Sequence, residues 1–227
     1  MLDSPGLFSF IFEILEIIGI TLRMSLASTL IASVTGIILG LLLERNRFPG
    51  KRVAVRLCRT LMGMPPVVAG LLIYLLFMRR GPLGFLGLLF TIRAMIIAQV
   101  VLITPIITGM IYTYASRSAP VIRSFAKTMG ADRFQTNILF LKEMRGEIYF
   151  AVISAFSRAV SEVGAVMIVG GNIQHKTRTM TTAISMLRNM GDFRQGIILG
   201  ILLLVIAFIL QSLSDIFHKG EVTEENL

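Results

Sequence analysis

Two opposite charges, Arg158 and Glu162, lie in the middle of an apolar run that covers residues 148–169. Their spacing places both side chains on one face of a helix. A charge at that depth in a bilayer is costly unless it faces protein or water. Ser157 and Ser161 line adjacent faces. The group predicts either a polar patch on a translocation path or an ion pair that fixes helix packing.

A proline pair, Pro65-Pro66, falls inside a second apolar run at 57–78 and follows Gly63. Two prolines remove two backbone donors and break a helix. In lipid the freed carbonyls must be satisfied by protein or by a water-lined cavity. The pair therefore predicts either a discontinuous helix at a transport path or a kink without function.

Two polar segments that we expect on the outer side of the membrane are the third candidate for chemistry. Threonine-rich residues 170–192 contain Gly170-Gly171, and hydroxyls and amides beside such a pair could contact a tetrahedral oxyanion. They could equally form a short re-entrant helix that contacts no ligand. The external cations Arg79, Arg80, Lys176 and Arg178 would steer an anion or contact lipid head groups.

Motifs of enzymatic chemistry are missing from the sequence. It has no G-x-x-x-x-G-K-[ST] loop, so the chain cannot hydrolyse ATP by the P-loop route. The two histidines are far apart, no Ser/His/Asp set is visible, and the lone Cys58 permits neither an internal disulfide nor a metal cluster. The sequence predicts a protein that is not itself an enzyme.

The elements that must position these residues are membrane spans. The 227 residues have a mean hydropathy of +0.79, with 55% hydrophobic and 15% charged residues, which is typical of one polytopic all-α membrane domain over 1–227. The net charge is +9, but the basic residues lie between apolar runs. They are better explained by topology and contacts with membrane lipids than by nucleic acid.

Five spans are predicted, at residues 22–43, 57–78, 94–112, 148–169 and 197–213. Residues 7–20 are apolar but short and contain Glu13 and Glu16, so they predict an N-terminal interfacial helix, with a sixth span as the alternative. The basic residues of 44–59 make that loop cytoplasmic. This puts the N-terminus outside and the C-terminus in the cytoplasm.

The longest polar interval between spans, residues 124–145, has its own pattern. Apolar residues recur at helical spacing on both sides of Gly130, which predicts a helix, a glycine turn and a second helix. Basic residues are interleaved with them. A folded cytoplasmic segment of this length, where an ordinary loop needs only a few residues, predicts a docking surface for a partner.

The interval also resembles a known family. Its small-x-Ala-x-x-x-Gly-Ala pattern resembles the coupling loop of ABC importer permeases. The resemblance implies that 117–146 is a coupling loop in which an apolar knob enters a groove on a separate ATPase. The implied contact residues are Ser124, Phe125, Ala126, Lys127, Met129, Gly130, Ala131, Arg133 and Phe134.

A second resemblance covers most of the chain from Arg45 to Ile184. The run FSRAVSEVGA, residues 156–165, followed by Gly170-Gly171-Asn172, resembles molybdate, sulfate and tungstate permeases, and the tungstate branch most. It implies the type I ABC importer permease fold and a translocation pathway. The implied pathway residues are Pro65, Pro66, Ser157, Arg158, Ser161, Glu162, Gly164, Asn172, Thr181 and Thr182.

The same resemblance implies an assembly and a mechanism. Two copies of the chain form a homodimer in the cytoplasmic membrane of a prokaryote, with two ATPase subunits and an external oxyanion-binding protein. ATP and Mg²⁺ bind the ATPases, and this chain holds no cofactor. Transport of an oxyanion, tungstate first and molybdate or sulfate next, proceeds by alternating access.

Two other classes of protein remain as alternatives. A secondary anion transporter or channel would need no ATPase and is expected to show inverted repeats, of which none is visible in the sequence. A purely structural membrane protein would not need the folded 124–145 interval. Co-purification of an ATPase would separate these classes.

Overall fold

The first element is one helix, α1 (Ser4–Arg45), in a computed structural model that describes residues 4–224. Residues 7–20 are therefore the first part of this helix and not a separate interfacial helix as predicted. The helix continues without a break through the expected junction, where the Thr21 hydroxyl donates to the Ile17 carbonyl of the same helix at 2.7 Å. At 1.5 Å per residue the 42 residues extend about 63 Å, roughly twice a hydrocarbon core. One end of α1 must project beyond the bilayer.

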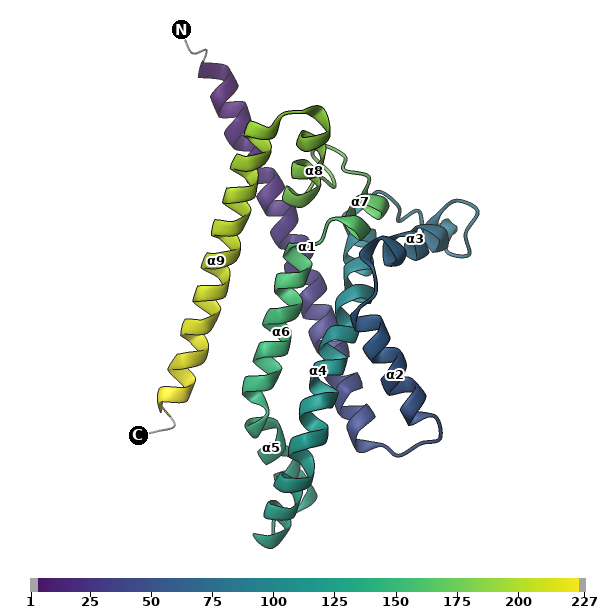
Figure 1. Ribbon diagram of the computed structural model, residues 1–227, viewed down its shortest axis with the longest axis vertical. Helices are drawn as coiled ribbons and strands as arrows, with labels where there is room; N and C mark the ends of the chain where they lie inside the picture. The colour runs from purple at the N-terminus through teal and green to yellow at the C-terminus, as the bar shows by residue number, and fades with distance from the viewer. Residues whose placement is uncertain (1–3, 225–227) are drawn as a thin grey trace.

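The central element is α4 (Ile92–Thr128), which packs along α1 (Figure 1). Gly36 and Gly40 of α1 allow this approach. A Cβ on either glycine would lie 2.8 Å from the Cβ of an isoleucine of α4, Ile107 or Ile111. This is the close packing of small residues that membrane helices use. The helix continues well past the predicted span of 94–112, so its last turns project beyond the other long helices.

Two of the expected spans are broken helices. Helices α2 (Lys51–Met62) and α3 (Pro66–Phe77) meet at 105°, which confirms the break predicted at the proline pair. Helices α6 (Arg145–Val160) and α7 (Gly164–Gly170) meet at 56°. This second break was not predicted, since 148–169 reads as one apolar run without a proline.

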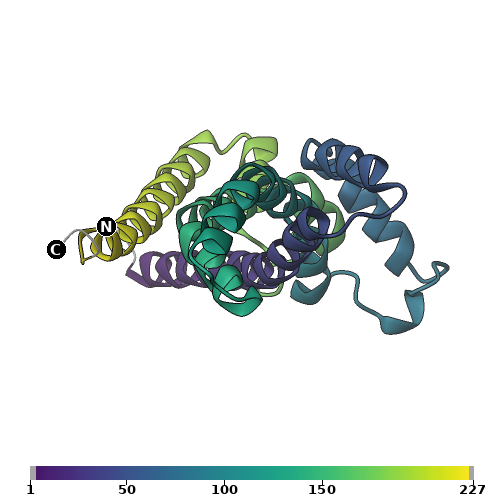
Figure 2. The same ribbon diagram turned by 90° about the horizontal axis from the view of Figure 1, so that it is seen from below.

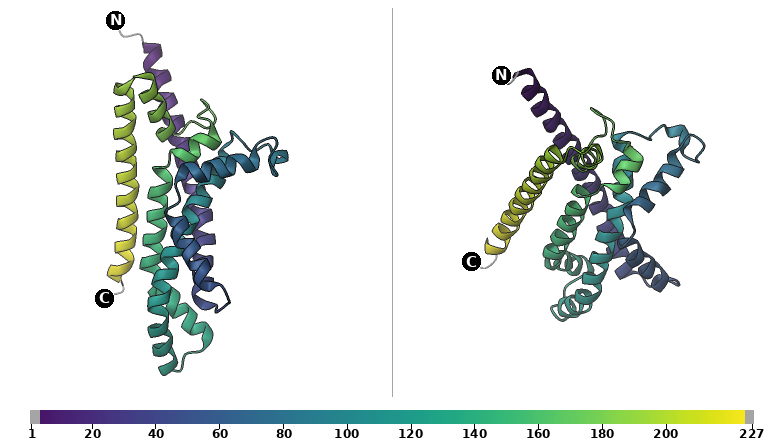
Figure 3. Two further views of the ribbon diagram at one scale, coloured as in Figure 1. Left: turned by 45° about the vertical axis from the view of Figure 1, so that its right-hand side comes forward. Right: turned by 45° about the horizontal axis from the view of Figure 1, so that its top comes forward.

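The two breaks lie against each other because α3 packs on α7. A Cβ on Gly70 of α3 would lie 2.7 Å from the Cα of Ala165 in α7. A Cβ on Gly164 would lie 3.1 Å from Val67 and 3.5 Å from Pro66. Figure 3 shows α3 crossing the direction of the long helices at the level of α7. Glycines thus bring both discontinuities into direct contact.

The remaining helices are the 3₁₀ turn η1 (Gly84–Leu86), α5 (Arg133–Glu143), α8 (Met180–Met190) and α9 (Phe193–Glu224). Helix α9 contacts α8 and, less extensively, α6. Seen from below, it lies on one side of the α1, α4 and α6 group, with α2 and α3 on the other (Figure 2). Several of its large apolar side chains, such as Leu204 and Phe208, are exposed, whereas Leu199 is buried.

Within residues 4–224, three helical segments are long and apolar enough to cross a membrane alone: Phe12–Arg45, Ile92–Thr128 and Phe193–Ser212. The number rises to five if each bent pair forms one span. The all-helical architecture and these five segments agree with the predicted polytopic fold.

Candidate translocation and coupling sites

The Arg158–Glu162 pair sits at the break between α6 and α7. Arg158 Nη2 lies 3.5 Å from Glu162 Oε2, so the predicted pairing is confirmed. The two side chains differ in environment, since Arg158 is 44% exposed and Glu162 only 4%. Glu162 Oε1 also accepts the Ala165 amide of α7 at 3.3 Å. The carboxylate therefore serves both as a counter-ion and as a cap for the helix after the break.

Gln99 of α4 is a site residue that the sequence analysis missed. Its side chain is fully buried, donates from Nε2 to the Ala159 carbonyl at 2.7 Å, and accepts the Ser28 hydroxyl on Oε1 at 2.6 Å. It ties α1 and α4 to the last turn of α6, directly before the break. A polar amide inside the predicted span 94–112 was the available signal, but its partners come from distant parts of the sequence.

Thr181 and Thr182 of α8 support the break from the other side. The Thr181 hydroxyl donates to the Glu162 carbonyl at 2.8 Å, which satisfies a group freed by the break. Thr182 forms the capping box of α8 with Thr179. Both side chains are buried, so within one subunit neither faces an open path as predicted for pathway residues. The short helix expected as an alternative in 170–192 is present as α8.

The other predicted pathway residues divide into two groups. Ser157 and Ser161 are exposed beside Arg158 on α6, and the Ser161 hydroxyl donates to the Ser157 carbonyl at 3.0 Å. Pro65 is exposed at the neighbouring break, and Pro66 is half-buried against Gly164. The structure thus brings these six residues to one pair of breaks.

Asn172 lies at the opposite end of α7, with φ +50°. Its side-chain oxygen is buried and accepts no hydrogen bond from the described residues. It follows Gly171, whose φ of +71° ends α7. Asn172 is therefore not part of the cluster at the breaks.

A cluster of polar contacts, here called the α1 polar cluster, joins α1 to the segment between α7 and α8. Arg178 Nη1 donates to Glu13 Oε1 at 3.0 Å, Gln174 Nε2 donates to the same oxygen at 3.1 Å, and His175 Nδ1 lies 2.6 Å from Glu16 Oε2. Arg178 is only 13% exposed. It is therefore not a free steering cation, contrary to the prediction for the external basic residues.

The 117–146 interval folds as predicted around Gly130, which has φ +71°. The first helix is the end of α4 rather than a separate short helix, and the second is α5, whose capping box is formed by Asp132 and Gln135. A Cβ on Gly130 would meet no atom within 4 Å. The left-handed backbone, and not crowding, therefore calls for glycine at this position.

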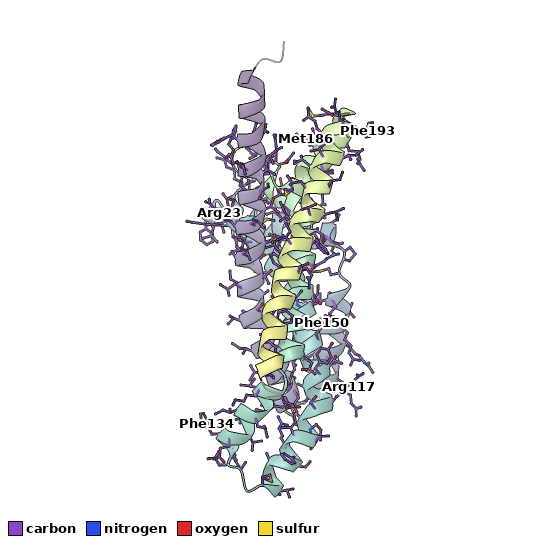
Figure 4. The ribbon with its side chains drawn as sticks, turned by 90° about the vertical axis from the view of Figure 1, so that its left-hand side faces the viewer. Arg23, Arg117, Phe134, Phe150, Met186 and Phe193 are labelled. Atoms are coloured by element: carbon purple, nitrogen blue, oxygen red, sulfur yellow. The ribbon has the colours of Figure 1, made fainter. Side chains whose placement is uncertain are left out.

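The tip of this interval carries an exposed apolar surface, here called the docking knob: Phe125, Met129 and Phe134. Each side chain is at least 60% exposed. Figure 4 shows Phe134 at the extremity of the molecule opposite Phe193. The neighbouring cations Lys127 and Arg133 are exposed too.

Three other predicted contact residues have different surroundings. Ser124 is exposed, and its hydroxyl donates to the Val121 carbonyl at 2.8 Å. Ala131 is half-buried, and its amide donates to the Ala126 carbonyl at 3.0 Å. Ala126 is buried within the chain, so it supports the turn from inside rather than contributing to the exposed surface.

Comparison with known proteins identifies the class. Residues 32–221 match the family described as binding-protein-dependent transport system inner membrane component. The chain belongs to this family of membrane permease components, which are the non-catalytic parts of ABC transporters.

Individual relatives agree with this class. The chain is 43% identical over 202 residues to the tungstate uptake system permease protein TupB of Peptoclostridium acidaminophilum, covering 89% of both chains. It is 34% identical over 210 residues to a probable anion ABC transporter permease protein of Haloferax volcanii, covering 90% of both. The inward-facing MetNI methionine ABC transporter has a similar fold, with a TM-score of 0.70, 18% identity and coverage of 96% of this chain and 99% of that one.

Proposed function

We propose that this chain is the permease subunit of an ATP-driven importer of tungstate, with molybdate and sulfate as the next candidates. The observation that carries the proposal is its 43% identity, over 89% of its length, to a tungstate uptake permease. The polar group at the paired helix breaks supports the same conclusion, because it presents the half-exposed Arg158 guanidinium to an anion.

The electrostatics at the breaks suit an anion in transit. The half-exposed guanidinium of Arg158 can donate charge-assisted hydrogen bonds to an oxyanion. Its partner Glu162 brings the formal charge of the pair to zero. An anion then meets a hydrogen-bond donor without a net positive charge, so it is not held tightly, and transport requires a site that also releases its ligand. The Ser157 and Ser161 hydroxyls lie beside Arg158, where they donate to Gln211 Oε1 at 3.4 Å and to the Ser157 carbonyl at 3.0 Å.

The working assembly is a homodimer with two ATPase subunits, which bind ATP and Mg²⁺, and an external binding protein. The exposed docking knob and its basic rim support contact with the ATPase. The connection from α1 to α2, which is rich in basic residues, and the turn from α4 to α5 lie toward the same end of the molecule, the lower end in Figure 1. The positive-inside rule makes this end cytoplasmic, with the N-terminus outside and the C-terminus inside. ATP-driven movement of the knobs would open the breaks alternately to the two sides.

The test is reconstitution in proteoliposomes with the ATPase and the binding protein. We expect uptake of tungstate that requires ATP, with slower or no uptake of molybdate and sulfate. Tungstate uptake by the permease alone would favour the alternative, a secondary transporter or channel. Uptake of sulfate in preference to tungstate would overturn the assigned substrate while leaving the importer class intact.

Coupling is tested by Gly130→Asp in the same liposomes. The variant should insert normally, because no span changes, but ATP hydrolysis should no longer respond to the loaded binding protein. Gly191→Asp is a matched control, since Gly191 also has a positive φ, +79°, and no atom within 4 Å of an added Cβ. Normal coupled transport by Gly130→Asp would remove the docking knob from the mechanism.

A further inference from the structure

A basic hollow of about 850 Å³ lies where α1 turns into α2 and faces α4. Its cations are Arg47, Lys51, Arg52, Arg56 and Arg59, and Tyr112 of α4 completes the wall. None of the described residues that line it is acidic. The volume lies in the range of ordinary small-molecule sites.

The nearest carboxylate in the sequence is not available to neutralise the hollow. Glu44 forms a two-pronged ion pair with Arg123, at 2.7 and 2.9 Å. Lys51 is fixed at the wall, because its ammonium donates to the Glu44 and Asn46 carbonyls and lies 5.8 Å from the Tyr112 ring centroid. The hollow therefore keeps its positive charge.

Three arginines, Arg52, Arg56 and Arg59, form one stripe of α2, since they are four and three residues apart. All three side chains are exposed, and in the described part of the chain no carboxylate pairs with them. Val53 and Leu57 occupy the adjoining stripe and are 67% and 57% exposed. A cationic stripe beside an exposed apolar stripe matches a molecule with an anionic head and an apolar tail.

We propose that this hollow is a binding site for an acidic phospholipid of the cytoplasmic leaflet. The chemistry recognised is a tetrahedral oxyanion group, the lipid phosphate, which arginine forks bind in two-pronged geometry. The acyl chains lie along Val53 and Leu57. Helix α2, which carries these arginines, lies toward the end of the molecule where α4 turns into α5 (Figure 1). The lipid anchors α2, the half of the broken helix that leads to Pro65.

The site is tested by lipid binding to the purified permease. Native mass spectrometry would compare phosphatidylglycerol with phosphatidylcholine for the wild type and for Arg52→Gln/Arg56→Gln/Arg59→Gln. We expect a preference for phosphatidylglycerol that falls roughly a hundredfold in the triple variant, and about fivefold for Arg56→Gln alone, in line with the usual gain for each cation near an anionic surface. Binding of phosphatidylcholine should not change.

The matched control, Arg79→Gln/Arg80→Gln/Lys176→Gln, removes three charges between α3 and α4 and between α7 and α8. These cations lie outside the hollow, so any head group that they contact is a different one. The phosphatidylglycerol affinity of the hollow should therefore stay within about twofold of the wild type. The site would be overturned if this control lost as much phosphatidylglycerol affinity as the triple variant. It would also be overturned if neither the triple variant nor Arg56→Gln lost any affinity. The single variant keeps the test decisive if the triple variant does not fold.

A lipid phosphate and a free oxyanion offer the arginines the same tetrahedral group. Inorganic phosphate and tungstate, added as competitors, distinguish between these two ligands. We expect millimolar amounts of either to leave the bound lipid in place. Displacement of the lipid at micromolar tungstate, with binding of tungstate itself lost in the triple variant, would make the hollow a free-anion site and overturn the lipid assignment.

Discussion

Replacing Gln99 with leucine tests whether this buried amide holds the break between α6 and α7. Leucine is close to glutamine in size but offers neither hydrogen bond. The change removes the bond from Nε2 to the Ala159 carbonyl and the bond from the Ser28 hydroxyl to Oε1, at 2.7 and 2.6 Å. In a water-soluble protein, each buried group left unsatisfied would cost about 1–3 kcal/mol.

The structure lowers this estimate in two ways. The Ser28 hydroxyl also lies 3.1 Å from the Ser25 carbonyl, and the Ala159 carbonyl also accepts the Glu162 amide at 3.4 Å, so both groups retain a weaker partner. Hydrogen bonds between membrane helices contribute on average only about 0.6 kcal/mol. We therefore expect Gln99→Leu to lower the free energy of unfolding by about 1 kcal/mol.

The assay is unfolding in bicelles by steric trapping, with a double-mutant cycle that includes Ser28→Ala. The coupling energy between Gln99 and Ser28 should be about 0.6 kcal/mol. Thr35→Ala is the control, because the exposed Thr35 hydroxyl donates to the carbonyl of Ile31 in its own helix, and it should change stability by less than about 0.5 kcal/mol. A cost above about 3 kcal/mol would refute the weaker-partner argument. A stabilised variant would refute the role of Gln99 as a support.

Three further predictions follow from the packing of the breaks and from the α1 polar cluster. Arg158→Ala should destabilise the protein more than Glu162→Gln, because the loss of Arg158 leaves the Glu162 carboxylate, which is 4% exposed, without its cation. The opposite order in bicelle unfolding would contradict the pairing. Gly70→Val should lower the free energy of unfolding by at least about 2 kcal/mol, because the added Cβ would lie 2.7 Å from the backbone of α7. Gly200→Val is the control and should lower it much less, because no atom lies within 4 Å of a Cβ added there. Equal effects of the two changes would argue against the contact between α3 and α7. Arg178→Gln removes the ion pair with Glu13 and should change the free energy of unfolding by less than about 1 kcal/mol. It should nevertheless raise the rate of amide hydrogen exchange in the first turns of α1. An unchanged rate there would show that the ion pair does not stabilise the start of α1.

Features that depend on local chemistry were predictable from the sequence. The proline pair Pro65-Pro66 separates two helices, because two successive prolines remove two backbone donors. Gly130 and its apolar flanks specify a turn between two helices, because glycine adopts positive φ without a steric penalty. The apolar runs and the basic residues between them indicated a polytopic membrane protein. The run of 156–165, with Gly170-Gly171-Asn172 beyond it, indicated the family.

The length of α1 was mispredicted because its two glutamates have their partners far along the chain. Glu13 and Glu16 interrupt the apolar run and predicted a separate helix at 7–20. In the structure they pair with Arg178 and His175, more than 150 residues later. No local pattern contains that information.

The sequence by itself determined the number of apolar segments, the break at the prolines, the glycine turn and the spacing of Arg158 and Glu162. Only the tertiary structure decided that α6 ends before Glu162. Such an end frees backbone carbonyls, and in an apolar interior these must find donors. Gln99 of α4 and Thr181 of α8 supply them for the Ala159 and Glu162 carbonyls. The break therefore exists where donors from distant helices meet it, and this requires the packed fold.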